Sequence, residues 1–366
     1  MKDRAMQALH KLALDPVAET MADPNSYGFR SYRSCADAIS QCFISLAKSY
    51  SPRWILEGDI KACFDEISHQ WMLDNIPMDK RVLQKWLKSG YVEGGKLYPT
   101  FRGTPQGGII SPVLANMVLD GLESAAKATA PVRIQGNIRS KINVIRYADD
   151  FVITGNSESM LNEIKPAVEE FLKERGLSLS EEKTSITRIE DGFDFLGQNP
   201  RKYGEKLLIK PARKNVKAFL GNIRETIRKH AAARADVLIK VLNPKIRGWA
   251  NYYRHVVSGR IFGLVDNCIY RYIWQWMRRK HPRKRKSWLV AKYWSNGSRP
   301  WSFSAVIKEG DAKSARIELE RAHNVRIKRH VKIRGDANPF DPEYEHYLLE
   351  TICPKSKDKG CQAQAA

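Results

Sequence analysis

The chain has 366 residues, 43% of them hydrophobic, which is enough for two or three domains. Its net charge of +22 comes wholly from residues 201–300, which carry 26 basic and 4 acidic residues, so we expect a polyanion partner there. The absence of an apolar run of about 18–20 residues and of a signal peptide argues against a membrane or secreted protein. Six scattered cysteines lack disulfide-framework or zinc-ribbon spacing, so we expect reduced thiols and a cytoplasmic location.

The first part of the chain mixes helical and strand-like periodicity. The pattern predicts three helices and a helical stretch up to about residue 78, a buried strand, and a glycine-rich loop. The helices are expected over residues 2–21, 34–47 and 112–130, the strand over 54–60 and the loop over 103–111. This succession favours an α+β domain.

The middle of the chain continues with a hairpin and then becomes helical. Strands are predicted over 142–147, 151–154, 183–189 and 193–197, and helices over 159–175, 215–232, 235–255 and 260–279. Pro200 and Pro211 mark a boundary, after which the chain is expected to be mainly α-helical.

Asp149 and Asp150 lie side by side at the tip of the predicted hairpin, flanked by apolar residues. Two carboxylates in such a place repel each other and lose hydration, so a divalent cation such as Mg²⁺ would compensate them. Asp59, at the end of another predicted strand, could add a third carboxylate and allow a two-metal site for phosphoryl transfer. An exposed acidic turn is the simpler alternative.

The surrounding motifs resemble those of group II intron-encoded reverse transcriptases. Residues 147–150 (Tyr-Ala-Asp-Asp) resemble their Y-x-D-D signature, and residues 103–116 resemble their G-T-P-Q-G block almost letter for letter. Three more blocks, at residues 25–30, 59–65 and 182–197, resemble others of the family in the same order. The resemblance implies an α+β fold: a right-hand polymerase palm with a ferredoxin-like sheet and partial fingers, followed by an α-helical thumb and maturase domain.

The resemblance also implies roles for single residues. Asp59, Asp149 and Asp150 match the catalytic metal triad, and the carbonyl of Ile60 an additional ligand. Phe64 matches the aromatic ring that excludes a ribose 2′-hydroxyl, although a core phenylalanine is an equal alternative.

Four further positions match substrate-contacting places in the family. Gln106 and Gly107 match the loop beside the nucleotide and template, although a plain turn also uses glycine. Lys183 matches a lysine near the primer end, and a surface lysine is the alternative. Arg30 could contact the template backbone, while capping of the local fold is the alternative we favour.

The basic segment resembles the thumb, or domain X, of the same family. Its lysines and arginines suit phosphate contacts, and its aromatic residues suit base stacking or a helical core, with core favoured for Trp249, Trp274 and Trp276. The expected RNA-binding residues are Arg278, Arg279, Lys280, Arg283, Lys284, Arg285 and Lys286. Intron RNA, an RNA template, a DNA primer and dNTPs are the implied partners.

The domains expected from the resemblance are residues 1–205 for partial fingers and palm, 206–300 for the thumb and 301–366 for a C-terminal extension. The chain is expected to lack the upstream fingers block that binds the triphosphate and a C-terminal H-N-H nuclease. The alternatives to an RNA-directed DNA polymerase with maturase activity are therefore an RNA-binding splicing cofactor and an inactive remnant. Host, intron and oligomeric state stay open.

Overall fold

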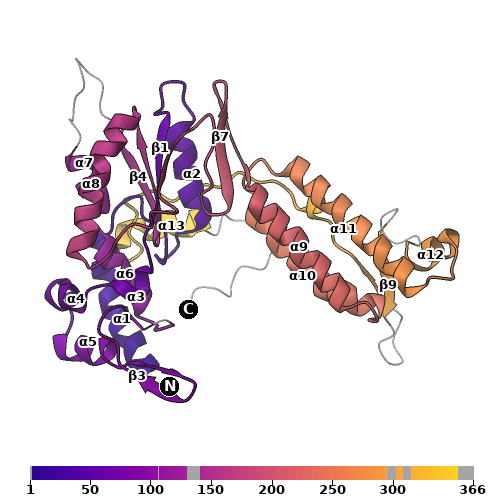
Figure 1. Ribbon diagram of the computed structural model, residues 1–366, viewed down its shortest axis with the longest axis horizontal. Coiled ribbons are helices and arrows are strands. Elements are labelled where there is room, and N and C mark those ends of the chain that lie inside the picture. Colours follow the sequence, from indigo (N-terminus) through magenta and orange to yellow (C-terminus); the bar gives the residue numbers. More distant parts are fainter. Residues whose placement is uncertain (1, 106, 130–140, 295–301, 308–314, 353–366) are drawn as a thin grey trace. The chain divides into compact units, whose positions relative to one another are not determined.

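The computed structural model describes residues 2–105, 107–129, 141–294, 302–307 and 315–352 (Figure 1). The chain forms two compact units. Unit 1 comprises Met1–Leu196, Pro200–Leu207 and His330–Ala366, and unit 2 comprises Gly197–Asn199 and Leu208–Arg329. The first passage between them lies near the expected boundary at residue 205, whereas the return of the chain to unit 1 at residue 330 was not expected.

A four-stranded antiparallel sheet forms the centre of unit 1, in the order β4-β5-β1-β6. Its strands are β1 (Trp54–Asp59), β4 (Asn143–Tyr147), β5 (Asp150–Gly155) and β6 (Ser185–Arg188). The apolar runs predicted as strands are buried here because α8 (Glu158–Glu174) packs on β5 and β1, and α2 (Cys35–Leu46) on β4. The predicted α+β fold class is confirmed.

The other elements of unit 1 are α1 (Lys2–Met21), α3 (Cys63–Glu66), α4 (His69–Asn75), α5 (Lys80–Leu87), β2 (Tyr91–Glu93), β3 (Lys96–Tyr98), α6 (Ser111–Leu119) and α7 (Leu122–Ala128). The single helix predicted over 112–130 was wrong, because Gly121 has a φ of 96° and separates α6 from α7. The carboxylate of Asp23 accepts from the N–H groups of Gly121 and Glu123, at 3.1 and 3.3 Å, and holds this break.

The strand predicted over 193–197 was also wrong. Leu196 and Gly197 have φ values of 49° and 71°, so the chain turns there. The extended segment comes afterwards, as β7 (Gln198–Tyr203), which pairs with β8 (Lys206–Pro211) where the chain passes between the units.

Unit 2 is built on α9 (Arg213–Lys229), α10 (Ala235–Tyr253), α11 (Gly259–Lys280) and α12 (Lys286–Tyr293). The three long helices match the predicted ones because apolar residues recur at helical spacing on their buried faces, for example Val265, Ile269 and Ile273 of α11. A short antiparallel hairpin of β9 (Ser304–Ile307) and β10 (Ala315–Glu318), followed by η1 (Ala322–Asn324), was not predicted.

The last described segment of the chain belongs to unit 1 and contains η2 (Pro342–Tyr344) and α13 (Glu345–Ile352). Asp37, which is 1% exposed, binds the N–H of Ile333 at 3.0 Å and pairs with His330 at 2.9 Å. Arg33 donates to the carbonyls of Arg334 and Ala337, at 2.6 and 2.7 Å. Residues 330–337 are thus fastened to the start of α2 by buried polar contacts.

No helix among the described residues is both long enough and apolar enough to cross a bilayer.

The sheet predicts a difference between two glycine-to-alanine substitutions. A Cβ on Gly58 would lie 2.2 Å from the ring of Phe151 on the neighbouring strand, so Gly58→Ala should lower the free energy of unfolding of unit 1 by about 1–3 kcal/mol. Gly221 in α9 has open space around it, so Gly221→Ala should stabilise its helix by about 1 kcal/mol. Urea unfolding followed by tryptophan fluorescence measures both, and equal effects would contradict the packing described for β1 and β5.

Candidate active site

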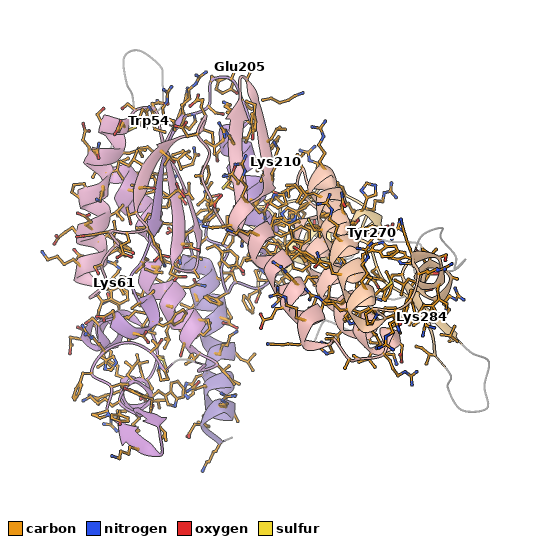
Figure 2. All side chains as sticks on the ribbon, turned by 45° about the vertical axis from the view of Figure 1, so that its right-hand side comes forward. Trp54, Lys61, Glu205, Lys210, Tyr270 and Lys284 are labelled. Carbon is orange, nitrogen blue, oxygen red and sulfur yellow. The ribbon has the colours of Figure 1, made fainter. Side chains whose placement is uncertain are left out.

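The register of the sheet brings Asp59 and Asp150 opposite each other, because β1 pairs antiparallel with β5. Asp149 occupies the turn before β5, where Ala148 has a φ of 57°. The carbonyl of Asp149 accepts a hydrogen bond from the N–H of Ile60 at 3.3 Å. The three predicted carboxylate residues therefore lie at one end of the sheet, next to Lys61 and at the opposite end of β1 from Trp54 (Figure 2).

The segment of residues 25–28 supports this turn from behind. Two backbone hydrogen bonds join this segment to Arg146. The N–H of Tyr27 donates to the carbonyl of Arg146 at 2.9 Å, and the N–H of Arg146 donates to the carbonyl of Asn25 at 3.0 Å. Gly28 lies so close that a Cβ there would be 2.3 Å from the nitrogen of Ala148. Only a glycine allows this approach without displacing the acidic turn.

Burial and like charge dominate the electrostatics of the site. Burial, and then the carboxylates of Asp149 and Asp59, raise the pKa of Asp150 to about 6, while Lys183 opposes the shift. Lys183 donates to both carboxylate oxygens of Asp59, at 3.1 and 3.0 Å, and this bond raises the pKa of the ammonium group. The carboxylates therefore favour a cation beside them.

The donor set fits a metal that takes its other ligands from substrate and water. Among the described residues, no three His, Cys, Asp or Glu side chains form a cluster that could hold an ion by themselves. Mg²⁺ in phosphoryl-transfer sites takes only one or two carboxylates and fills its octahedron with phosphate oxygens and water. Asp59 and Asp150, paired across two strands, can supply that number. The role expected for the carbonyl of Ile60 stays a prediction.

The predicted nucleotide contacts are placed unevenly. Phe64 is half-buried on α3, where it packs against the core and makes an edge-to-face contact with Phe29. Gly107 has a φ of 79°, and nothing lies within 4 Å of where a Cβ would be, so this backbone is open to a ligand. Gln106 lies outside the described residues.

The substrate role expected for Arg30 does not agree with its contacts. Its Nε and Nη2 donate to Glu19 at 2.9 and 2.6 Å, and its Nη1 donates to the carbonyls of Asp23 and Ser26. The side chain is only 6% exposed. These contacts favour the alternative, in which Arg30 holds the local fold.

The sequence interpretation missed a buried ionic network behind the acidic turn. Arg146 forms an ion pair with Asp120 at 2.5 Å, and its Nη1 donates to the amide oxygen of Asn116 at 3.3 Å. Asn116 in turn donates to the carbonyl of Gly28 at 2.8 Å. An arginine inside the apolar strand 142–147 was the signal, because such a charge is buried only with a partner.

The basic cluster of unit 2 lies at the end of α11 and the start of α12. Arg278, Arg279 and residues 283–286 are exposed, while Lys280 is half-buried and donates to the carbonyls of Ala232 and Ala233. Figure 2 labels Lys284 among them, and its ammonium lies 5.3 Å from the ring centre of Trp288. The cluster thus presents charge to solvent, except at Lys280.

The aromatic residues of unit 2 mainly pack against one another. Trp276 is 3% exposed, and half-buried Trp249 stacks on Phe219 with ring centres 4.7 Å apart. Half-buried Trp274 stacks on Trp294 at 6.0 Å. The expectation that these tryptophans form a helical core is confirmed.

Comparison with known families agrees with this geometry. Residues 1–199 match the family model described as reverse transcriptase (RNA-dependent DNA polymerase), and residues 216–294 match the group II intron maturase-specific domain. Because the first match covers more than half of the chain, the protein belongs to the reverse transcriptase family. Polymerases of this family use divalent metal ions, and the two domains imply RNA binding.

Several individual proteins are similar over shorter or longer parts. The group II intron-encoded protein LtrA of Lactococcus lactis subsp. cremoris is 25% identical, over 84% of this chain and 65% of LtrA. Protein YkfC of Escherichia coli is 29% identical, over 57% of this chain and 64% of YkfC. Apo telomerase from Candida tropicalis, truncated from its C-terminal domain, aligns with a TM-score of 0.42 and 15% identity, over 54% of this chain and 44% of that chain. The chain spans less than two thirds of each.

Burial of Asp150, together with repulsion by Asp149 and Asp59, predicts that Asp150→Asn stabilises the metal-free protein. Asp150 has a raised pKa in the folded state, so its ionisation opposes folding as the pH rises from about 4 to about 6. The substitution should therefore add about 1–2 kcal/mol of stability at pH 8 and almost nothing below pH 4. Thermal unfolding in EDTA measures this, with exposed Asp74→Asn as control. A loss of stability at pH 8 would contradict it.

Proposed function

We propose that this chain is an RNA-directed DNA polymerase of a group II intron, and that it also binds the intron RNA as a maturase. The observation that carries the proposal is the register that pairs Asp59 with Asp150 beside Asp149, within a segment that matches the reverse transcriptase family. The substrates are an RNA template, a DNA primer and dNTPs.

Asp59, Asp149 and Asp150 are the residues that would hold Mg²⁺. Mg²⁺ held there would supply activation of the primer 3′-hydroxyl and neutralisation of the charge on the transferring phosphate. The chain itself contributes a rigid frame, since two strands and the turn at Ala148 fix the separation of the carboxylates.

Lys183 contributes a mobile positive charge. Its side chain is 66% exposed and bound to Asp59, so it can turn to a phosphate oxygen when that carboxylate binds a cation. Phe64 lies on the short helix α3, which follows Asp59 closely in the chain, and we assign to it the ring that excludes the 2′-hydroxyl of a ribonucleotide. Gly107 lets the backbone approach the nucleotide or template.

A second function, RNA binding without polymerisation, rests on a different observation. The exposed basic residues at the junction of α11 and α12 lie in the part of the chain that matches the maturase-specific domain. Lysine and arginine side chains neutralise backbone phosphates whether or not the polymerase site works. Both functions can therefore be tested separately.

Primer extension on an RNA template tests the polymerase function. With Mg²⁺ and dNTPs the parent should extend the primer, and Asp149→Ala should lower the rate by about a hundredfold or more, because the metal loses a ligand. Asp74→Asn, an exposed change on α4, should leave the rate unchanged. A parent that extends no primer but promotes intron splicing would refute the polymerase function and leave the maturase function.

The salt dependence of RNA binding tests the role of the basic cluster. The double variant Lys284→Gln/Lys286→Gln should bind group II intron RNA more weakly, and the slope of log affinity against log salt should fall by about 1.5. Lys165→Gln/Lys173→Gln removes two exposed charges from α8 in unit 1 and should leave the slope unchanged. Filter binding between low and moderate salt measures both slopes. If the parent and Lys284→Gln/Lys286→Gln had equal slopes, the basic cluster would not contact the RNA.

A further inference from the structure

Phe29 combines two unusual features beside the acidic turn. Its φ is 57°, in the left-handed region that a bulky side chain rarely adopts, and its side chain is 51% exposed. Such a conformation costs free energy and persists only where the surroundings impose it. Exposing a phenylalanine ring to water adds to that cost.

The neighbours of Phe29 explain how its backbone is held. The carbonyl of Gly28 accepts from Asn116, and Gly28 packs on Ala148. On the other side, Arg30 is fixed by Glu19 and by the carbonyl of Ser26. Phe29 lies between two anchored residues, so its backbone is held on both sides, and the contacts of Gly28 are also those that support the acidic turn.

The ring of Phe29 points at Phe64. The ring centres are 6.0 Å apart and the ring planes make an angle of 78°, an edge-to-face geometry that aromatic pairs favour. Phe64 lies on α3, which has only four residues and begins after Ala62, itself at a φ of 44°. A helix this short cannot fix a side chain by itself, so the orientation of Phe64 depends on what packs against it.

We propose that Phe29 is a positioning residue that holds the ring of Phe64 and thereby strengthens discrimination between deoxyribonucleotides and ribonucleotides. The inference rests on the proposed polymerase function for its consequence, but the contact itself does not. The anchors at Gly28 and Arg30 maintain the backbone strain at Phe29, and this conformation keeps its ring against Phe64.

Single-nucleotide extension with dCTP and with CTP measures the consequence. Phe29→Ala should lower the ratio of the two kcat/KM values about fivefold, since the aromatic pair is lost, while Phe29→Tyr should keep the ratio. Phe29→Gly removes the ring and relieves the backbone strain, so it should act like Phe29→Ala in a stably folded protein. Phe43→Ala, which removes another half-exposed phenylalanine, should change nothing.

A double variant separates positioning from direct contact. If Phe29 acts through Phe64, the ratio in Phe64→Ala should not fall further when Phe29→Ala is added. An unchanged ratio in Phe29→Ala and Phe29→Gly, or an additional loss in the double variant, would overturn the proposal.

Fluorine NMR decides the contact without any polymerisation. In protein labelled with fluorophenylalanine, the signal of Phe64, assigned with Phe64→Leu, should shift in Phe29→Gly and stay in place in Phe43→Ala. A Phe64 signal that ignores Phe29→Gly would refute the positioning role. If the parent extends no primer but the Phe64 signal shifts in Phe29→Gly, the polymerase function is refuted and the contact between the two rings is supported.

Discussion

The site in unit 1 depends on holding Asp59, Asp149 and Asp150 together at one partly buried end of the sheet. Burial raises the pKa of Asp150 and the other two carboxylates raise it further, so the sheet must hold these groups together against their own charge. The neighbouring backbone holds the turn in place. Residues 25–28 form hydrogen bonds with the N–H and the carbonyl of Arg146, and Gly28 packs directly against Ala148. The charge at this end of the sheet lowers stability, and the Mg²⁺ that we propose there would compensate it.

The buried side chain of Arg146, paired with Asp120 and bonded to Asn116, stabilises the acidic turn. Arg146 stands with its charge paired to Asp120, and burial raises the pKa of Asp120 to about 6 although the arginine opposes the shift. Breaking such a pair leaves an uncompensated buried charge, which costs more than the pair contributes. The acidic turn, in which like charges lie together, is therefore supported by a neighbouring ion pair in which opposite charges neutralise each other.

The two units divide the charge in a corresponding way. Unit 1 gathers carboxylates at one end of its sheet, whereas unit 2 places its excess of lysine and arginine on the solvent side of a helical core rich in tryptophan and tyrosine. Aliphatic residues such as Leu238 and Ile273 fill that core together with aromatic residues such as Trp276, so apolar burial is retained beneath the strongly basic surface of unit 2.

Most of unit 1's sheet could be predicted because its strands are apolar runs and its carboxylates follow them directly, as in residues 54–60. The interruption at Gly121 could not, since it depends on Asp23, which lies 98 residues earlier. The partners of Arg146 and the return of the chain to unit 1 could not be predicted either, although an arginine inside an apolar strand indicated that a buried partner exists. Asp37 lies in the first turn of α2, a common place for an acidic residue, and its partner His330 is 293 residues away. Hydrophobic periodicity and turn residues describe only neighbouring positions, so they do not indicate contacts between residues far apart in the sequence.

That long-range pairing has a consequence for the order in which the chain folds. Unit 1 is assembled from segments on both sides of unit 2, so synthesis must proceed through nearly 300 residues after Asp37 before its last partners emerge. At ribosomal speeds this delay is roughly 15–60 s. Ser34 and Asp37 form a capping box in the meantime, so α2 has a local partner for its buried carboxylate. Residues 330–337 therefore become available to unit 1 only after the whole of unit 2 has been synthesised.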